Sequence, residues 1–173
     1  MASKNYQIRK RLWETVDEDS LWVPSQNIGF CQVPRGLTLV NLIIDKLSKG
    51  KPVSQTFLGL WVKHFDHAVV RIDNPTVFAF EAGFGGARAL GTWRTRMRIL
   101  KDLGMIDFAP GPYGEISYVL MFDPYKRVVQ MQKENLLKEL EAEYNTLVER
   151  IETTTIQRSQ RIKSESTLAE LPS

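Results

Sequence analysis

The residues whose side chains most clearly suggest a binding role are cations gathered in one stretch of the chain. Five positively charged residues and no acidic one lie between positions 84 and 101: Arg88, Arg94, Arg96, Arg98 and Lys101. At 100° per residue, Arg94, Arg98 and Lys101 fall on one side of a helix, whereas Arg96 lies nearer the apolar side. Guanidinium and ammonium groups on one stripe can bind phosphates and the edges of guanine bases. A solvated helix face is the alternative explanation of such a stripe.

The histidines and the cysteine form no recognisable catalytic or metal-binding set. His64 and His67 flank Asp66, but the sequence has no third histidine, and its single cysteine, Cys31, lies far away along the chain. We therefore expect no metal site, no cofactor and no catalytic residue, and we do not expect an enzyme. The lone cysteine fits a reducing compartment, and no stretch resembles a signal peptide or membrane span, so a cytoplasmic protein without membrane contact is expected.

The stretch that carries the cations predicts a helix followed by a β-hairpin. Three apolar residues recur at helical spacing on the side opposite the cations: Trp93, Met97 and Leu100. Thr92 stands where an N-cap hydroxyl would bind free amides, and Gly104 stands where a left-handed residue would end the helix. Beyond Gly104 the period changes to two, so 105–108 and 116–122 are predicted strands around a turn at 110–114.

The pattern Leu100-x-x-x-Gly104-Met105-Ile106 follows Ala89-Leu90-Gly91-Thr92 and precedes a hairpin tip rich in glycine and proline. Together these features resemble the recognition helix and wing of winged helix-turn-helix DNA-binding domains, over roughly 73–124. The resemblance implies a helix that buries one face in its domain. The other face would carry cations and small polar groups into the major groove of double-stranded DNA.

The predicted DNA-binding residues take their roles from their chemistry. They are Arg88, Thr92, Arg94, Thr95, Arg98, Lys101 and Tyr113. The two arginines of the stripe and Thr95 would read base edges, because guanidinium forks suit guanine. Arg88 and Lys101 would hold phosphates, and Tyr113 at the hairpin tip would touch the adjacent backbone or minor groove. Arg96 is expected to pair with a neighbouring residue instead.

The part of the chain before this stretch predicts a small helical core. Apolar spacing predicts one helix over 37–49 and a second that begins at Ser54, followed by a short strand at 69–72. Over 76–82 we expect a short helix, although so few residues fit a buried strand as well. The opening 11 residues are basic and precede an acidic segment, and they form either a flexible arm or a short helix.

The C-terminal part predicts a long helix and a tail. No glycine or proline occurs over 125–152, and five apolar residues there follow spacings of three and four: Leu137, Leu140, Tyr144, Leu147 and Ile151. Such a seam fits either packing against the N-terminal segment or self-association into a homodimer. The composition of 153–173 is rich in serine, threonine and charge, which predicts a disordered tail.

The sequence as a whole predicts an α+β protein, mainly α with a small β-hairpin. Its 173 residues suffice for one domain with an appendage. We expect an N-terminal arm at 1–36, a winged-helix domain at 37–124, a C-terminal helix at 125–152 and the tail. The expected function is sequence-specific DNA binding by a dimeric regulator of transcription or of replicon replication or partition. A winged helix used only for protein contacts in a larger assembly is the alternative.

Overall fold

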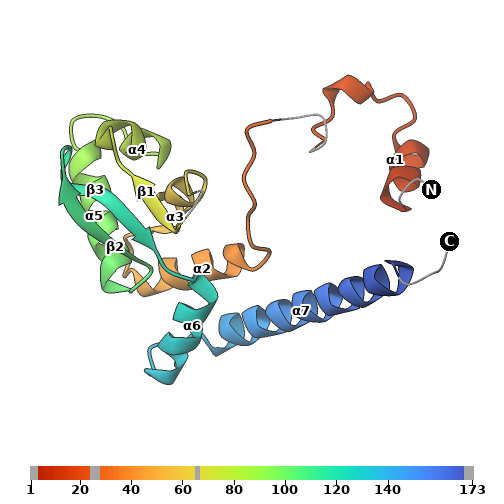
Figure 1. Cartoon of the computed structure of the whole chain (residues 1–173). Coiled ribbons are helices and arrows are strands. Elements are labelled where there is room, and N and C mark those ends of the chain that lie inside the picture. Colours follow the sequence, from red (N-terminus) through yellow and green to blue (C-terminus); the bar gives the residue numbers. More distant parts are fainter. Residues whose placement is uncertain (1–3, 24–27, 65–66, 170–173) are drawn as a thin grey trace. The chain divides into compact units, whose positions relative to one another are not determined.

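The computed structural model describes residues 4–23, 28–64 and 67–169, with backbone alone at Glu18 and over 158–169 (Figure 1). The chain divides into two compact units, Met1–Gln32 and Val33–Ser173. The first unit contains α1 (Lys4–Leu12) and a short 3-10 helix, Glu18–Ser20. The basic opening of the chain is therefore a helix, in which the guanidinium of Arg9 lies 5.1 Å from the ring centre of Tyr6.

The second unit contains the remaining helices and one sheet. In chain order its elements are α2 (Leu37–Leu47), α3 (Ser54–Trp61), β1 (Val69–Arg71), α4 (Pro75–Glu81), α5 (Ala89–Asp102), β2 (Ile106–Gly111), β3 (Gly114–Met121), α6 (Pro124–Lys133) and α7 (Glu141–Ala169). The strands form a three-stranded antiparallel sheet in the order β1-β3-β2. The structure thus confirms the α+β fold class.

The sheet has one buried and one exposed face. Val70 of β1 pairs with Val119 of β3, and both side chains are buried against the helices. The neighbouring pair, Val69 and Leu120, is exposed, as expected where successive side chains alternate between faces. The core on the buried side is filled by large apolar side chains from the helices, including Ile43, Phe57, Leu60, Trp93 and Met97.

The helix α4 settles the ambiguity over 76–82 in favour of a helix. Its N-cap is Asn74, whose side-chain oxygen accepts hydrogen bonds from the N–H groups of Thr76 and Val77 at 3.1 and 3.4 Å. Pro75 occupies the first turn, where its missing N–H costs nothing. Gly83 then follows the helix with φ +82°, a left-handed conformation that favours glycine.

The helix α5 buries the predicted face, but it begins earlier than expected. Trp93, Met97 and Leu100 are fully buried, and Gly104 follows the helix with φ +70°. The N-cap position belongs to Arg88, and the N–H of Thr92 already donates to the Arg88 carbonyl at 2.9 Å. The prediction of Thr92 as N-cap is therefore wrong. The good helix formers Ala89 and Leu90 extend the helix by one turn.

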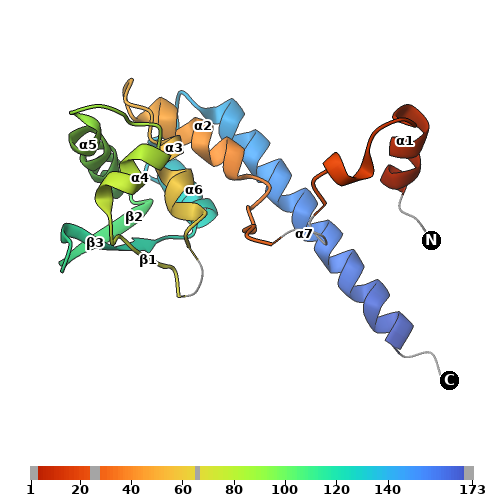
Figure 2. The ribbon, with the colours of Figure 1, turned by 90° about the horizontal axis from the view of Figure 1, so that it is seen from above.

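The predicted C-terminal helix is divided into two. The α6 helix begins after Asp123, whose carboxylate caps it, and the chain then turns at Asn135, a left-handed residue with φ +59°. Leu140 and Leu147 of the predicted seam are buried, and α7 packs along α2 (Figure 2). Leu147 contacts the start of α2 closely, because a Cβ added at Gly36 would lie 2.8 Å from its Cδ1.

The helical backbone of α7 continues to Ala169, through most of the stretch for which composition predicted a disordered tail. No glycine or proline interrupts 141–169. Hydroxyl groups within this stretch bond back to the helix: Thr153 and Thr154 each donate to the carbonyl four residues earlier at 2.8 Å. Residues 170–173 lie outside the described part of the chain.

Candidate nucleic-acid interface

The α5 helix presents its cations on the face opposite the core. Arg94, Arg98 and Lys101 are exposed, while Trp93 and Met97 are buried on the other side. Arg94 has no hydrogen bond or ion pair with any residue that the structure describes. Its guanidinium is therefore available to an external acceptor.

Two of the three cations are held by carboxylates of the β2–β3 hairpin. Arg98 Nη2 lies 2.9 Å from Glu115 Oε2, and these side chains are 53% and 58% exposed. Lys101 Nζ lies 2.6 Å from Asp107 Oδ1. Sequence reasoning missed both acids, because the contacts depend on how the hairpin folds back along α5.

The ion pair of Lys101 with Asp107 is shorter than that of Arg98 with Glu115. Its ammonium also lies 4.5 Å from the ring centre of Phe108, the residue after Asp107. The hydrogen bond from Lys101 lowers the pKa of the Asp107 carboxyl below its ordinary value, and the backbone N–H of Phe108 adds to this effect. The Asp107 carboxyl therefore favours its ionised form, and Lys101 meets an external phosphate only by exchanging this partner.

The other predicted residues of α5 lie between its N-cap and its middle. Arg88 is exposed at the N-terminal end of the helix, and Thr92 and Thr95 are half-buried. The hydroxyl of Thr95 donates to the Gly91 carbonyl at 3.0 Å, so its proton is engaged within the helix. The oxygen of Thr95 can still accept a hydrogen bond, for example from a base amino group.

Arg96 lies apart from the stripe, as its position on the helix indicated. Its guanidinium carbon is 5.8 Å from the ring centre of Phe84, in the connection between α4 and α5. Its Nε is buried without a hydrogen-bond partner among the described residues. Arg96 therefore belongs to the packing of the two helices.

Tyr113, at the hairpin tip, lies beside β1. Tyr113 is 43% exposed, and its ring centre lies 5.8 Å from the guanidinium carbon of Arg71 on β1. Ser117 fixes the tip, because its Oγ accepts from the Tyr113 N–H at 3.0 Å and donates to the Gly114 carbonyl at 2.9 Å. Arg71 is a further exposed cation that sequence reasoning overlooked. Its alternation with Val70 on a predicted strand was the available signal.

The structure therefore gathers six of the seven predicted residues on α5 or at its start, and it places the seventh, Tyr113, on the adjoining hairpin. Glu115 links the hairpin to α5, whereas Tyr113 links it to β1. Chemically, this surface offers several exposed donors, each with a planar or compact cationic head. Such groups can bind phosphate oxygens and base edges.

The histidines are separate from this surface. His64 packs against Trp61 with ring centres 5.6 Å apart, and His67 is exposed, while Asp66 between them lies outside the described residues. Across 4–23, 28–64 and 67–169, no cluster of three or more potential metal ligands is present. None of the helices described for this chain has the length and apolar character needed to cross a membrane.

Comparison with known proteins gives no assignment. No protein-family model, curated protein sequence or solved structure matches the chain.

Proposed function

We propose that this chain is a sequence-specific, double-stranded DNA-binding protein of the winged helix-turn-helix kind. In this proposal, α4 and α5 form the helix-turn-helix, α5 enters the major groove, and the β2–β3 hairpin is the wing. The biological role is that of a dimeric cytoplasmic regulator, of transcription or of replicon replication and partition.

The observation that carries the proposal is the two-sided character of α5. On one face, Trp93, Met97 and Leu100 are buried. The other face exposes a stripe of cations, and the first acidic residue of α5 is Asp102 at its end. A helix of this kind is anchored rigidly while it presents donors outward. Rigid presentation suits base readout, because hydrogen bonds to base edges require a fixed geometry.

The surroundings of α5 support the same proposal. The α4 and α5 helices pack together, and their connection contains two glycines with positive φ, Gly83 and Gly86. Glycine is common in the turn of helix-turn-helix units, and here the connection spans 82–88, longer than the usual turn of about three to four residues. The hairpin follows α5 directly and lies against it through the Arg98–Glu115 pair, so a groove that receives α5 would also meet the hairpin tip.

The carboxylates of Glu115 and Asp107 on the hairpin compete only weakly with DNA for the cations of α5. The side chains of both ion pairs are exposed, and exposed ion pairs contribute little to stability because water screens them. A phosphate or a guanine edge can therefore replace Glu115 or Asp107 at small cost. In the unbound protein the same pairs keep Arg98 and Lys101 extended along the surface.

In this proposal, two subunits associate through the part of α7 that follows Ile151. Leu140 and Leu147 are buried in the chain's own core, and Tyr144 and Ile151 pack against that core, so these positions are occupied. Farther along the helix, Ile156 is 57% exposed. A seam beyond Ile151 would leave the fold of each subunit intact.

The test is salt-dependent DNA binding by the purified chain. A duplex library selected on the protein should yield a preferred sequence, and log affinity should fall linearly with log salt. About three to five phosphate contacts would give a slope of roughly −3 to −5. Arg94→Ala should reduce specific binding, whereas Arg150→Ala, which removes the same charge from an exposed position of α7, should not.

The rival function is a winged-helix module that binds only proteins. It predicts no preferred duplex sequence and no difference between Arg94→Ala and Arg150→Ala in DNA retention. Either result would remove the proposal of direct DNA readout.

A further inference from the structure

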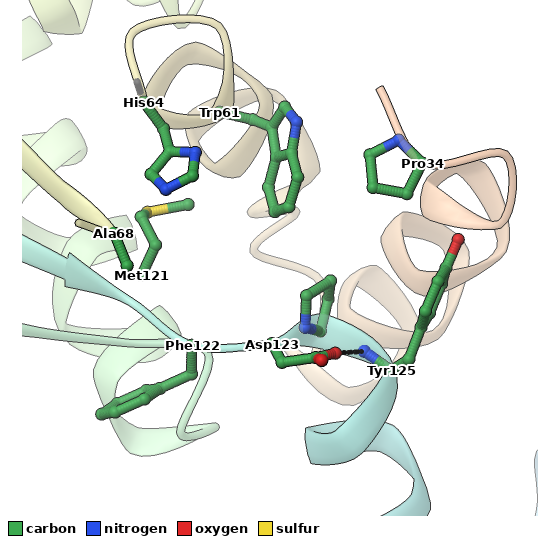
Figure 3. A pocket seen from close by; sticks show the side chains of 9 residues that line it. Pro34, Trp61, His64, Ala68, Met121, Phe122, Asp123 and Tyr125 are labelled. Carbon is green, nitrogen blue, oxygen red and sulfur yellow. Dashed lines mark hydrogen bonds between the residues drawn. The ribbon is translucent and has the colours of Figure 1, made fainter. Parts of the chain in front are cut away.

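A pocket lies away from the cation stripe, where the end of α3, the end of β3 and the start of α6 meet (Figure 3). It is an open pocket with a volume of about 390 Å³, which suits a small organic molecule. Its walls are mainly apolar and aromatic, and they include Trp61, His64, Pro34 and Tyr125. None of the proposed DNA contacts uses these residues.

The aromatic walls of the pocket are held in place by neighbouring rings and by the main chain. Trp61 lies between Phe57 and His64, with ring centres 6.0 and 5.6 Å away. The hydroxyl of Tyr125 accepts a hydrogen bond from the Gly36 N–H at 2.8 Å. A Cβ at Gly36 would come within 2.9 Å of the Tyr125 ring, so the absence of a side chain there lets the phenol sit against α2.

Asp123 supplies the charge of the pocket. Figure 3 shows the indole of Trp61 pointing toward the side on which Asp123 and Tyr125 lie. Asp123 Oδ1 accepts from the N–H groups of Tyr125 and Lys126 at 2.9 and 3.1 Å, which caps α6. Its Oδ2 has no partner in the part of the chain that the structure describes.

The lining is complementary to a positive charge. Asp123 is the lining residue with a full negative charge, and no lysine or arginine is among the described residues that form the pocket. An indole face and a phenol attract a cation placed within about 6 Å of the ring centre. The Asp123 carboxylate, exposed at the start of α6, adds an attraction for a cation that a neutral ligand of the same shape does not experience.

We propose that this pocket binds a small organic cation with an apolar body, such as an alkylated or aromatic ammonium compound. The ammonium group binds against the aromatic wall at Trp61 and is attracted by the nearby Asp123 carboxylate, and the apolar body fills the space toward Pro34 and Tyr125. The proposal is independent of DNA binding, because it rests on a different surface. It adds a ligand site at the joint between the sheet and the C-terminal helices.

The experiment uses the full chain with two pairs of probes. Benzyltrimethylammonium and choline are the cations, and neopentylbenzene and 3,3-dimethylbutan-1-ol, in which carbon replaces the charged nitrogen, are their uncharged counterparts. Binding is followed by ¹H–¹⁵N NMR, in which the indole signal of Trp61 is identified by its loss in Trp61→Leu. The cations should shift this signal and the amides of Ala68, Asp123 and Tyr125, and the uncharged probes should bind about tenfold more weakly or not at all.

The decisive variant is Asp123→Asn. Asparagine caps a helix about as well as aspartate, so the start of α6 should be retained while the charge is removed. The affinity for both cations should fall about tenfold, and that for the uncharged probes should not change. The matched control is Asp102→Asn, which neutralises an exposed carboxylate at the end of α5 and should leave cation binding unchanged.

Three outcomes would overturn the proposal. The first is the absence of any shift at Trp61 with saturating cation. The second is equal binding of charged and uncharged probes, which would show a pocket selective only for apolar bodies. The third is an equal loss of binding in Asp123→Asn and Asp102→Asn, which would show a general charge effect. The unmodified chain decides the first two outcomes, so they stand even where a variant is unstable.

Discussion

The Nε of Arg127 on α6 donates a hydrogen bond to the main-chain carbonyl of Leu103, at 2.7 Å. Leu103 is the C-cap residue of α5, so a cation from a helix 24 residues away occupies the negative end of the proposed recognition helix. The close approach requires glycine at the next position. A Cβ at Gly104 would lie 2.6 Å from the same Nε, and its φ of +70° independently favours glycine.

Replacing Arg127 should therefore destabilise the whole second unit. Arg127→Met keeps the aliphatic stem but removes the bond to Leu103 and the ion pair with Glu134, at 3.1 Å. We expect a loss of about 1–2 kcal/mol in the free energy of unfolding, measured by urea denaturation. Lys126→Met, at the exposed neighbouring position, should change it by less than about 0.5 kcal/mol. Equal effects of the two substitutions would contradict a role for Arg127 in holding α5.

The same ion pair should make stability depend on pH. Hydrogen bonds from Arg127, and secondarily from Gln130, lower the pKa of Glu134 in the folded state. A lowered folded pKa stabilises the fold above the ordinary glutamate pKa of about 4.3, and this contribution disappears as the pH falls through the lowered value. Urea denaturation between about pH 5 and pH 3 should show a shallower decline for Glu134→Gln than for the unmodified chain. Parallel curves would show that the carboxylate does not contribute.

The third prediction separates base readers from phosphate contacts on α5. Arg94→Ala and Arg98→Ala should each cost about 1–3 kcal/mol on the preferred duplex and relax the preference at one or two base pairs. Lys101→Ala should weaken all sequences alike and reduce the salt slope by about one. Titration of preferred and random duplexes by fluorescence anisotropy measures both quantities. Equal losses on the two duplexes for all three variants would leave only a general basic patch.

Removing a carboxylate of the hairpin should raise the affinity for DNA, whereas removing a cation of α5 should lower it. Glu115→Gln removes the charge that Arg98 must exchange for DNA, so the affinity for DNA should rise about two- to fivefold. Because the pair is exposed, the melting temperature should change little. Glu139→Gln, which neutralises an exposed acid outside this surface, serves as the control and should not affect binding. A fall in specific affinity for Glu115→Gln would show instead that Glu115 holds Arg98 in its reading position.

The fifth prediction divides α7 into an anchored and a distal part. A chain that stops after Glu152 keeps Leu140 and Leu147 in the core, so it should unfold cooperatively with nearly unchanged stability. A chain that stops at Asp123 exposes the apolar surface that α6 and α7 cover and should lose several kcal/mol. If the distal turns join two subunits, sedimentation should show a monomer for the chain ending at Glu152. A dimer of unchanged affinity would place the subunit contact elsewhere.

The features that sequence reasoning predicted well are those with local causes. Asn74-Pro75 marks the start of α4 and Gly83 its end, and Gly104 ends α5, because each signal acts within one turn of the chain. The buried and exposed sides of α5 also followed from helical periodicity alone. These signals sufficed for the order of elements from α2 to β3.

The features that it missed depend on contacts between distant segments. The Arg98–Glu115 and Lys101–Asp107 pairs join residues of different elements, so their formation depends on how the hairpin packs against α5. The chain between α6 and α7 is left-handed at Asn135 and buries Leu137. Asparagine tolerates both helical and left-handed backbone, so its presence alone does not predict a break. The pocket beside Trp61 likewise assembles three segments that are far apart along the chain.

The length of α7 sets both the distance of its far end from the core and the direction in which that end faces. Among the residues of α7 whose side chains the structure describes, Ile151 is the last one packed on the core. Ala169 lies eighteen residues farther along the helix, which corresponds to about 27 Å at 1.5 Å per residue. Inserting one residue after Ile151 would advance the far end by about 1.5 Å and turn it by about 100°, whereas inserting seven would leave it within about 20° of its original facing. Whatever attaches to the far end of this helix is thus held in a fixed angular phase with the domain that carries α5.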